Sequence, residues 1–181
     1  GHTETWIYPE NQPTRGYQLA ITSRSITQNT LVCLPTGLGK TFIAAVLMYN
    51  FYRWFPTGKI VFMAPTRPLV QQQLEACYFV TGLPETDTSV ITGTTMKPET
   101  RRDQWLKKRV FLVTPQILVN DLRNGIFPAA SLVCLVVDEA HRAQKNYAYC
   151  IAIRLLTAMN HTRYRVLALS ATPGSDLASV Q

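Results

Sequence analysis

The stretch that decides the fold is Thr30-Leu31-Val32-Cys33-Leu34-Pro35-Thr36-Gly37-Leu38-Gly39-Lys40-Thr41. Its first five residues are apolar or β-branched and predict a buried strand, and a glycine-rich turn ending in Lys-Thr follows. Glycine lets such a turn point its backbone N–H groups at phosphate oxygens, and the N-terminus of a following helix adds positive potential. The stretch therefore predicts a strand, a phosphate-binding turn and a helix.

The turn supplies candidate ATP-binding residues. Lys40 would reach the β- and γ-phosphates, and the Thr41 hydroxyl would bind Mg²⁺. The strict phosphate-binding pattern has glycine at position 34, where this chain has Leu34, and the shorter Gly-x-Gly-Lys-Thr form is typical of helicase-like proteins. An ordinary glycine turn before a helix is the alternative. The candidates are Pro35, Thr36, Gly37, Leu38, Gly39, Lys40 and Thr41.

A second motif, Asp138-Glu139-Ala140-His141, closes the apolar run 132–137. Asp138 would hold Mg²⁺, and Glu139 would orient or deprotonate the water that attacks ATP. The alternative is a solvated turn, which six apolar residues immediately upstream disfavour. A buried acidic pair needs a cation, so the motif predicts a magnesium-dependent ATPase site with Lys40, Asp138, Glu139 and His141 as catalytic candidates.

Three other positions are candidates for the same site. The Gln18 amide can pair with both the donor and the acceptor of an adenine edge, although a surface helix start is the alternative for this segment. Ser170 and Thr172 follow the last predicted strand. We expect His141 to bridge towards both of them and to report whether the γ-phosphate is present.

The order of strand, turn and helix repeats along the chain. Near-continuous apolar strands separated by helices predict an α/β fold, a RecA-like three-layer sandwich with a central, mostly parallel sheet and helices on both faces. Residues 1–181 are expected to form a single domain. Strands are predicted at 30–34, 59–63, 88–92, 110–113, 132–137 and 166–169, and helices at 41–55, 68–82, 97–109, 117–122 and 147–159.

Polar residues at the ends of other strands are candidate nucleic-acid contacts, because ligands gather at the carboxyl ends of parallel strands. Hydroxyls, amides and a guanidinium suit contacts to a phosphate backbone. The basic run 107–109 could touch a duplex, but its alternative is a solvated face. The nucleic-acid candidates are Thr66, Arg67, Thr92, Gly93, Thr114 and Gln116.

Composition is consistent with this picture. Lys and Arg number 18 against 11 acidic residues, a net charge of +7 that favours a polyanionic partner. The 4 cysteines are too far apart in sequence to form a zinc pair, which suits a reducing compartment. No apolar run is long enough to span a bilayer and no signal peptide is evident, so we expect a soluble, intracellular protein without a membrane partner.

The motifs are those of superfamily 2 helicases, and the wording between them resembles the Fanconi anaemia group M family, from Trp6 to Gln181. The resemblance implies a DNA-dependent ATPase that remodels forks and four-way junctions, with duplex or branched DNA and DNA repair proteins as partners, in the nucleus. Arg67 stands where lysine is expected and Gly16 where an acidic residue is usual. Segments that carry the resemblance are 6–9, 34–46, 50–56, 72–78, 146–150 and 167–176.

Such motors close ATP between two lobes, and the second lobe supplies arginine fingers from a Gln-x-x-Gly-Arg-x-Gly-Arg segment. This chain has no such segment, so we expect it to be the first lobe, to bind nucleotide weakly and to hydrolyse it negligibly. Alternatives are the lobe of a helicase that senses duplex RNA, a non-catalytic docking scaffold, or a DNA-stimulated nuclease module. The last lacks any acidic cluster beyond Asp138-Glu139.

Overall fold

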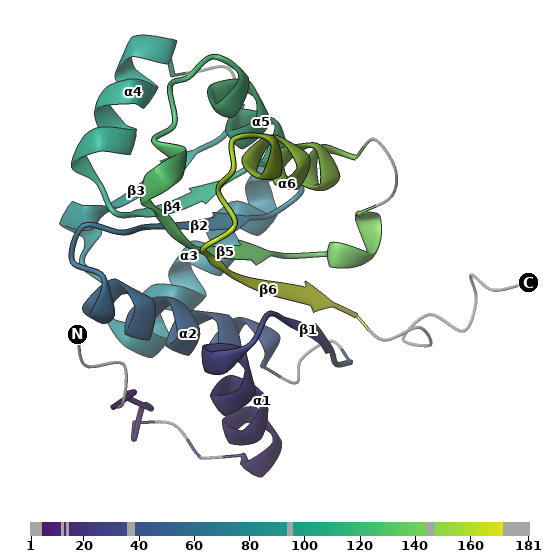
Figure 1. Ribbon diagram of the computed structural model, residues 1–181. Coiled ribbons are helices and arrows are strands. Elements are labelled where there is room, and N and C mark those ends of the chain that lie inside the picture. Colours follow the sequence, from purple (N-terminus) through teal and green to yellow (C-terminus); the bar gives the residue numbers. More distant parts are fainter. Residues whose placement is uncertain are drawn as a thin grey trace, which may run out of the picture.

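The computed structural model describes residues 5–11, 13, 15–35, 39–93, 96–143 and 147–171. Its centre is a six-stranded sheet of order β1-β6-β5-β2-β4-β3, and the paired strands run parallel throughout (Figure 1). The predicted α/β class is confirmed. The strands are β1 Thr30–Cys33, β2 Lys59–Met63, β3 Thr88–Ile91, β4 Val110–Val113, β5 Leu132–Val137 and β6 Arg165–Ser170.

Helices cover both faces of the sheet, so the molecule has three layers (Figure 1). The first three helices lie below the sheet in that view and the last three lie above it. Among the described residues, no helix is long and apolar enough to cross a membrane. The helices are α1 Gly16–Thr27, α2 Lys40–Trp54, α3 Arg67–Thr81, α4 Pro98–Lys107, α5 Pro115–Arg123 and α6 Ala148–Ala158.

Strand β2 shows why the apolar runs are continuous. Its side chains alternate between the two faces of the sheet. Ile60 and Phe62 enter the core between the sheet and α1–α3, while Val61 and Met63 enter the core between the sheet and α4–α6. These four side chains are 0% exposed. A strand buried on both faces favours apolar residues on each of them, and each such side chain contributes about 1.5–3 kcal/mol to stability.

Two parts of the helical layers differ from the sequence-based expectation. The helix α1 was expected only as an alternative explanation of Gln18, because its buried residues are the polar Gln18, Thr22 and Ser25, which give no apolar periodicity. Their burial is tolerated because Thr22 and Ser25 donate hydrogen bonds to backbone carbonyls within the helix. The helix α4 is shorter than the predicted 97–109; its Trp105 is fully buried, whereas the neighbouring Leu106 is 63% exposed.

The cysteines should differ sharply in reactivity. Burial raises the pKa of the Cys77 and Cys134 thiols to about 12, so almost no thiolate forms at neutral pH, whereas Cys33 is exposed. We expect iodoacetamide to label Cys33 in the native protein and to reach Cys77 and Cys134 only after denaturation. Mass spectrometry of the labelled peptides measures this, and fast native labelling of Cys134 would contradict the packing of β5.

Candidate nucleotide-binding site

Three neighbouring strands, β1, β6 and β5, end at one edge of the sheet, and a cleft of about 460 Å³ lies beside these ends. The sequence motifs come together here because each follows one of these strands. Helix α3 contributes the far wall. The lining residues are Gly39, Lys40, Thr41, Leu69, Gln72, Gln73, Asp138, Glu139 and Ala171.

The described part of the phosphate-binding turn requires glycine at its end. Gly39 has φ +80°, a left-handed conformation, and a Cβ there would lie 2.0 Å from the Gln18 Nε2 atom. Gln18, only 5% exposed, therefore packs its amide directly against the turn. Pro35 lies between β1 and this turn, while the candidates Thr36, Gly37 and Leu38 lie outside the described residues.

The two candidate magnesium ligands, Thr41 and Asp138, face the same cleft from α2 and from the end of β5. The Lys40 ammonium donates a hydrogen bond to the Leu34 carbonyl (3.0 Å), which ties it to the residue that follows β1. The Thr41 hydroxyl donates to Gln73 Oε1 (2.6 Å). The Gln73 amide in turn donates to Asp138 Oδ2 (3.4 Å).

Asp138 is 5% exposed, and its surroundings constrain both its position and its charge. Its backbone N–H donates to the Met63 carbonyl (2.9 Å), and its Oδ1 accepts the Glu139 N–H (2.9 Å). Burial raises the pKa of the Asp138 carboxyl, while the hydrogen bond from the Glu139 N–H opposes the rise. A carboxylate held in this way is stabilised by a nearby cation.

The donor set fits Mg²⁺. A hydroxyl and a carboxylate are oxygen ligands, which this hard cation prefers. Within the part of the chain that the structure describes, no group of three or more His, Cys, Asp or Glu residues could hold a metal. Mg²⁺ is usually bound by one or two protein oxygens together with waters and the phosphates of a substrate.

The Asp-Glu-Ala-His turn is connected to the end of β6. Glu139 has φ +54°, and its carboxylate Oε2 lies 3.2 Å from His141 Nε2. The other ring nitrogen, Nδ1, lies 3.3 Å from the Ser170 hydroxyl. His141 thus contacts one of the two residues towards which it was expected to bridge, and the other, Thr172, lies outside the described residues.

The nucleic-acid candidates lie at the same sheet edge, after β2, β3 and β4. Thr66 is the N-cap residue of α3, and Arg67 begins the helix. The Arg67 guanidinium covers Gly93, since a Cβ on this left-handed residue would lie 1.5 Å from Arg67 Nη2. Two segments distant in sequence, 66–67 and 92–93, are therefore brought together by one contact.

The two candidates after β4, Thr114 and Gln116, do not take part in the contact between Arg67 and Gly93. Thr114 is the N-cap residue of α5, and the exposed Gln116 donates to Asn120 within its own helix (2.8 Å). The basic run before β4 is used structurally: Lys107 pairs with Asp103 (2.9 Å), and the Arg109 guanidinium stacks on the Tyr52 ring at 3.9 Å. Arg109 is therefore held by contacts within the fold, and Lys107 is exposed as the solvated alternative expects.

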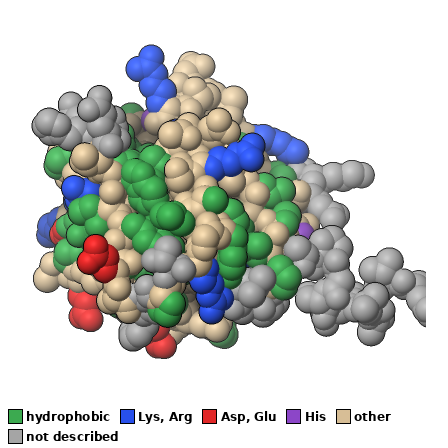
Figure 2. Space-filling view, turned by 90° about the horizontal axis from the view of Figure 1, so that it is seen from below, with side chains coloured by type: hydrophobic (Ala, Val, Ile, Leu, Met, Phe, Trp, Pro, Cys, Tyr) green, Lys and Arg blue, Asp and Glu red, His purple; other side chains and the backbone are tan. Residues whose placement is uncertain are grey.

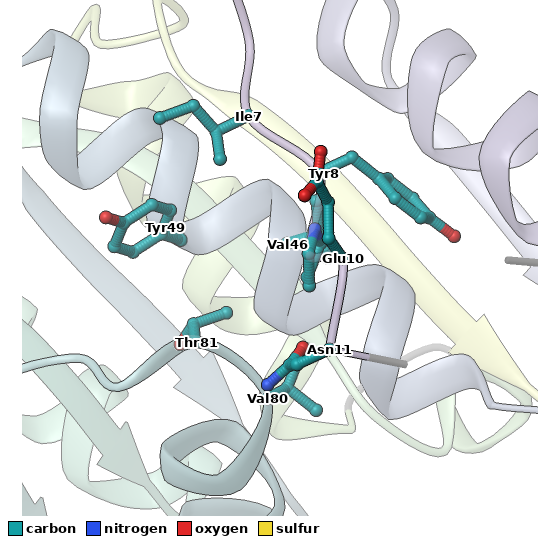
Figure 3. A pocket seen from close by; sticks show the side chains of 9 residues that line it. Ile7, Tyr8, Glu10, Asn11, Val46, Tyr49, Val80 and Thr81 are labelled. Carbon is teal, nitrogen blue, oxygen red and sulfur yellow. The ribbon is translucent and has the colours of Figure 1, made fainter. Parts of the chain in front are cut away.

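A second hollow, of about 430 Å³, lies where the N-terminal segment 7–11 crosses α2 and the end of α3 (Figure 3). The Asn50 side chain anchors the segment by accepting the Ile7 N–H (2.7 Å) and donating to the Ile7 carbonyl (2.8 Å). No predicted site residue lines it. The side chains shown there are Ile7, Tyr8, Glu10, Asn11, Val46, Tyr49, Val80 and Thr81.

Comparison with known families decides the class of this site. The sequence model described as DEAD/DEAH box helicase matches residues 15–180. The chain belongs to the DEAD/DEAH box helicase family. The helicase domain of Pyrococcus furiosus Hef has the same fold, with a TM-score of 0.81 and 35% identity over 93% of this chain and 35% of that one.

Two relatives of this helicase-family chain confirm the resemblance noted in its sequence. The mouse Fanconi anemia group M protein homolog is 59% identical over 176 residues, which are 97% of this chain and 9% of the mouse protein. The ATP-dependent DNA helicase fml1 of Schizosaccharomyces pombe is 51% identical over 98% of this chain and 21% of its own length. The chain therefore spans less than a quarter of either relative.

Two residues of this helicase-family site were not predicted. Gln73 joins Thr41 to Asp138, and the fully buried Tyr149 donates its hydroxyl proton to the Asp138 carbonyl (2.6 Å). A signal for Gln73 existed: it is the polar member of the otherwise apolar pattern 69, 70, 73, 74 and 77 of α3. Tyr149 gave none, because an apolar helix commonly includes a core tyrosine.

Proposed function

We propose that this chain is the ATP-binding lobe of an ATP-dependent DNA translocase or helicase that remodels branched DNA, such as replication forks and four-way junctions, in DNA repair. One observation carries the proposal: Lys40, Thr41, Asp138 and Glu139 line a single cleft at the carboxyl ends of the strands. Family membership and the names of the relatives support it. A chain that served only as a scaffold would have no physical reason to keep all four side chains.

In this proposal each residue has one task in ATP hydrolysis. Lys40 binds the β- and γ-phosphates, the described turn residues Pro35 and Gly39 shape the loop around them, and Gln18 selects adenine. Thr41 and Asp138 hold Mg²⁺, which when bound neutralises charge on the phosphate oxygens. Glu139 accepts a proton from the attacking water. His141 and Ser170 report to β6 whether the γ-phosphate is present.

Nucleic acid is assigned to the neighbouring part of the same edge. Thr66, Arg67 and the Thr92-Gly93 segment would contact the phosphate backbone, and Thr114 and Gln116 would extend the track after β4. Figure 2 shows the face below the sheet, where the Lys and Arg side chains drawn are scattered and hydrophobic ones gather at the centre. Among the described residues, that face does not offer a continuous basic surface to a polyanion.

The proposed motor contains a second RecA-like lobe, which would close the cleft and supply arginine fingers. Both relatives and the Hef chain are long enough to hold one. An arginine finger accelerates related phosphoryl transfer by roughly 10³–10⁵-fold. We therefore expect negligible ATP turnover by this chain alone. We expect the protein that contains both lobes to be nuclear and to have DNA repair proteins as partners.

The decisive experiment measures ATP turnover by the protein that contains this chain and the second lobe, called here the two-lobe protein. Fork DNA, linear duplex DNA and double-stranded RNA are compared as activators. Strongest stimulation by branched or duplex DNA is the expected result. Stimulation by RNA alone would assign the chain to an RNA sensor, and no turnover with any of them would leave a docking scaffold.

A further inference from the structure

The Gln73 side chain is placed between the two candidate magnesium ligands. Its amide oxygen accepts the Thr41 hydroxyl proton at 2.6 Å, and its amide nitrogen donates to Asp138 Oδ2 at 3.4 Å. A neutral amide can accept from one ligand and donate to the other without changing charge. Gln73 thus connects α2, α3 and the end of β5 at the point where they meet.

This arrangement has a chemical consequence for Thr41. A threonine hydroxyl has one proton and two lone pairs, and Gln73 engages the proton. Both lone pairs are then free to face a cation. Asp138 is fixed in the same way, because Oδ2 accepts the Gln73 amide and Oδ1 accepts the Glu139 N–H. The two ligands are oriented before any cation arrives.

The position of Gln73 is itself fixed by the core. Val70 and Cys77, one turn before and one turn after it on α3, are at most 2% exposed, and Leu69 and Leu74 pack against the same apolar cluster. The helix therefore cannot rotate without exposing these side chains. Because its backbone is held in place, the Gln73 amide can hold Thr41 and Asp138 at a set separation.

We propose that Gln73 is a positioning residue that holds Thr41 and Asp138 as a preformed pair of Mg²⁺ ligands. The inference rests on the proposed function, since it assumes that the cleft binds a magnesium nucleotide. Gln73 does not touch the nucleotide in this account; it acts by lowering the cost of ordering its two partners. Its effect should therefore appear in Mg²⁺-dependent binding and not in binding without the ion.

The test measures binding of a fluorescent ADP analogue to the chain, in EDTA and across a Mg²⁺ titration. Gln73→Met keeps the length of the side chain but removes both hydrogen bonds. We expect it to weaken Mg²⁺-dependent binding by about tenfold, the size of one lost hydrogen bond to a charged group. Binding in EDTA should be unchanged, and high Mg²⁺ should restore nucleotide binding by the variant.

Gln71→Met is the matched control, because Gln71 is exposed on the same helix and its amide donates to Glu75 (3.3 Å), away from Thr41 and Asp138. It should bind as the wild type does. Equal Mg²⁺ dependence in Gln73→Met and wild type would overturn the inference, as would an equal loss of binding with and without the ion. Absence of Mg²⁺-dependent binding in the wild type would instead contradict the proposed function, and the inference with it.

Discussion

Glu139→Gln is expected to lower ATP turnover of the two-lobe protein by about 10²–10⁴-fold, the usual contribution of a general base. The amide matches the carboxylate in shape but cannot accept a proton from water. The Glu139 side chain is 32% exposed at the cleft, so water can reach it, and its Oε2 lies 3.2 Å from His141 Nε2. Nucleotide binding should persist, because Lys40 and Thr41 remain.

Steady-state turnover in the presence of fork DNA measures this effect, and fluorescent ADP binding tests that the site is intact. Glu75→Gln provides the control, because Glu75 is exposed on α3, where its carboxylate accepts a hydrogen bond from Gln71. That variant should turn over ATP at the wild-type rate. If Glu139→Gln retained turnover within a few-fold of wild type, Glu139 would not be the base and the role assigned to it would be wrong.

The sheet and its motifs were predictable because their information is local. The predicted strands 59–63, 110–113 and 132–137 match β2, β4 and β5 residue for residue. Each motif follows a strand, and parallel strands bring their carboxyl ends to one edge, so Lys40 and Asp138 could be expected to meet although 98 residues separate them (138 − 40). The local sequence pattern and the parallel topology together were sufficient to predict which residues line the cleft from the two motifs.

Contacts that depend on side-chain packing could not be predicted in this way. Gln73 reaches Thr41 over 32 residues and Asp138 over 65, and no spacing rule connects them. The same holds for the bond between Trp105 and Asp121, which joins α4 to α5. Charged residues are expected at the surface, so a fully buried Asp121 is visible only once the helices are packed.

Asp121→Ala is expected to destabilise the fold by about 3–5 kcal/mol, because it leaves the buried Arg101 guanidinium without a counter-charge. Asp121 is 0% exposed and Arg101 is 8% exposed. The carboxylate accepts three hydrogen bonds of 2.8–3.1 Å from Arg101 and one of 2.7 Å from Trp105 Nε1. Removing it therefore leaves several buried donors unpaired at once.

Chemical denaturation of the chain and of Asp121→Ala measures the difference, with Asp103→Ala as the matched control. Asp103 also pairs with a base in α4, at 2.9 Å from Lys107, but this pair is exposed and should contribute no more than about 0.5 kcal/mol. Arg101 also donates to the Met96 carbonyl (2.7 Å), three residues after Gly93. Loss of the Arg101–Asp121 pair should therefore also loosen the segment at Thr92-Gly93 that is proposed to contact DNA. Equal stability of Asp121→Ala and Asp103→Ala would show that the buried pair does not stabilise the fold more than the exposed one.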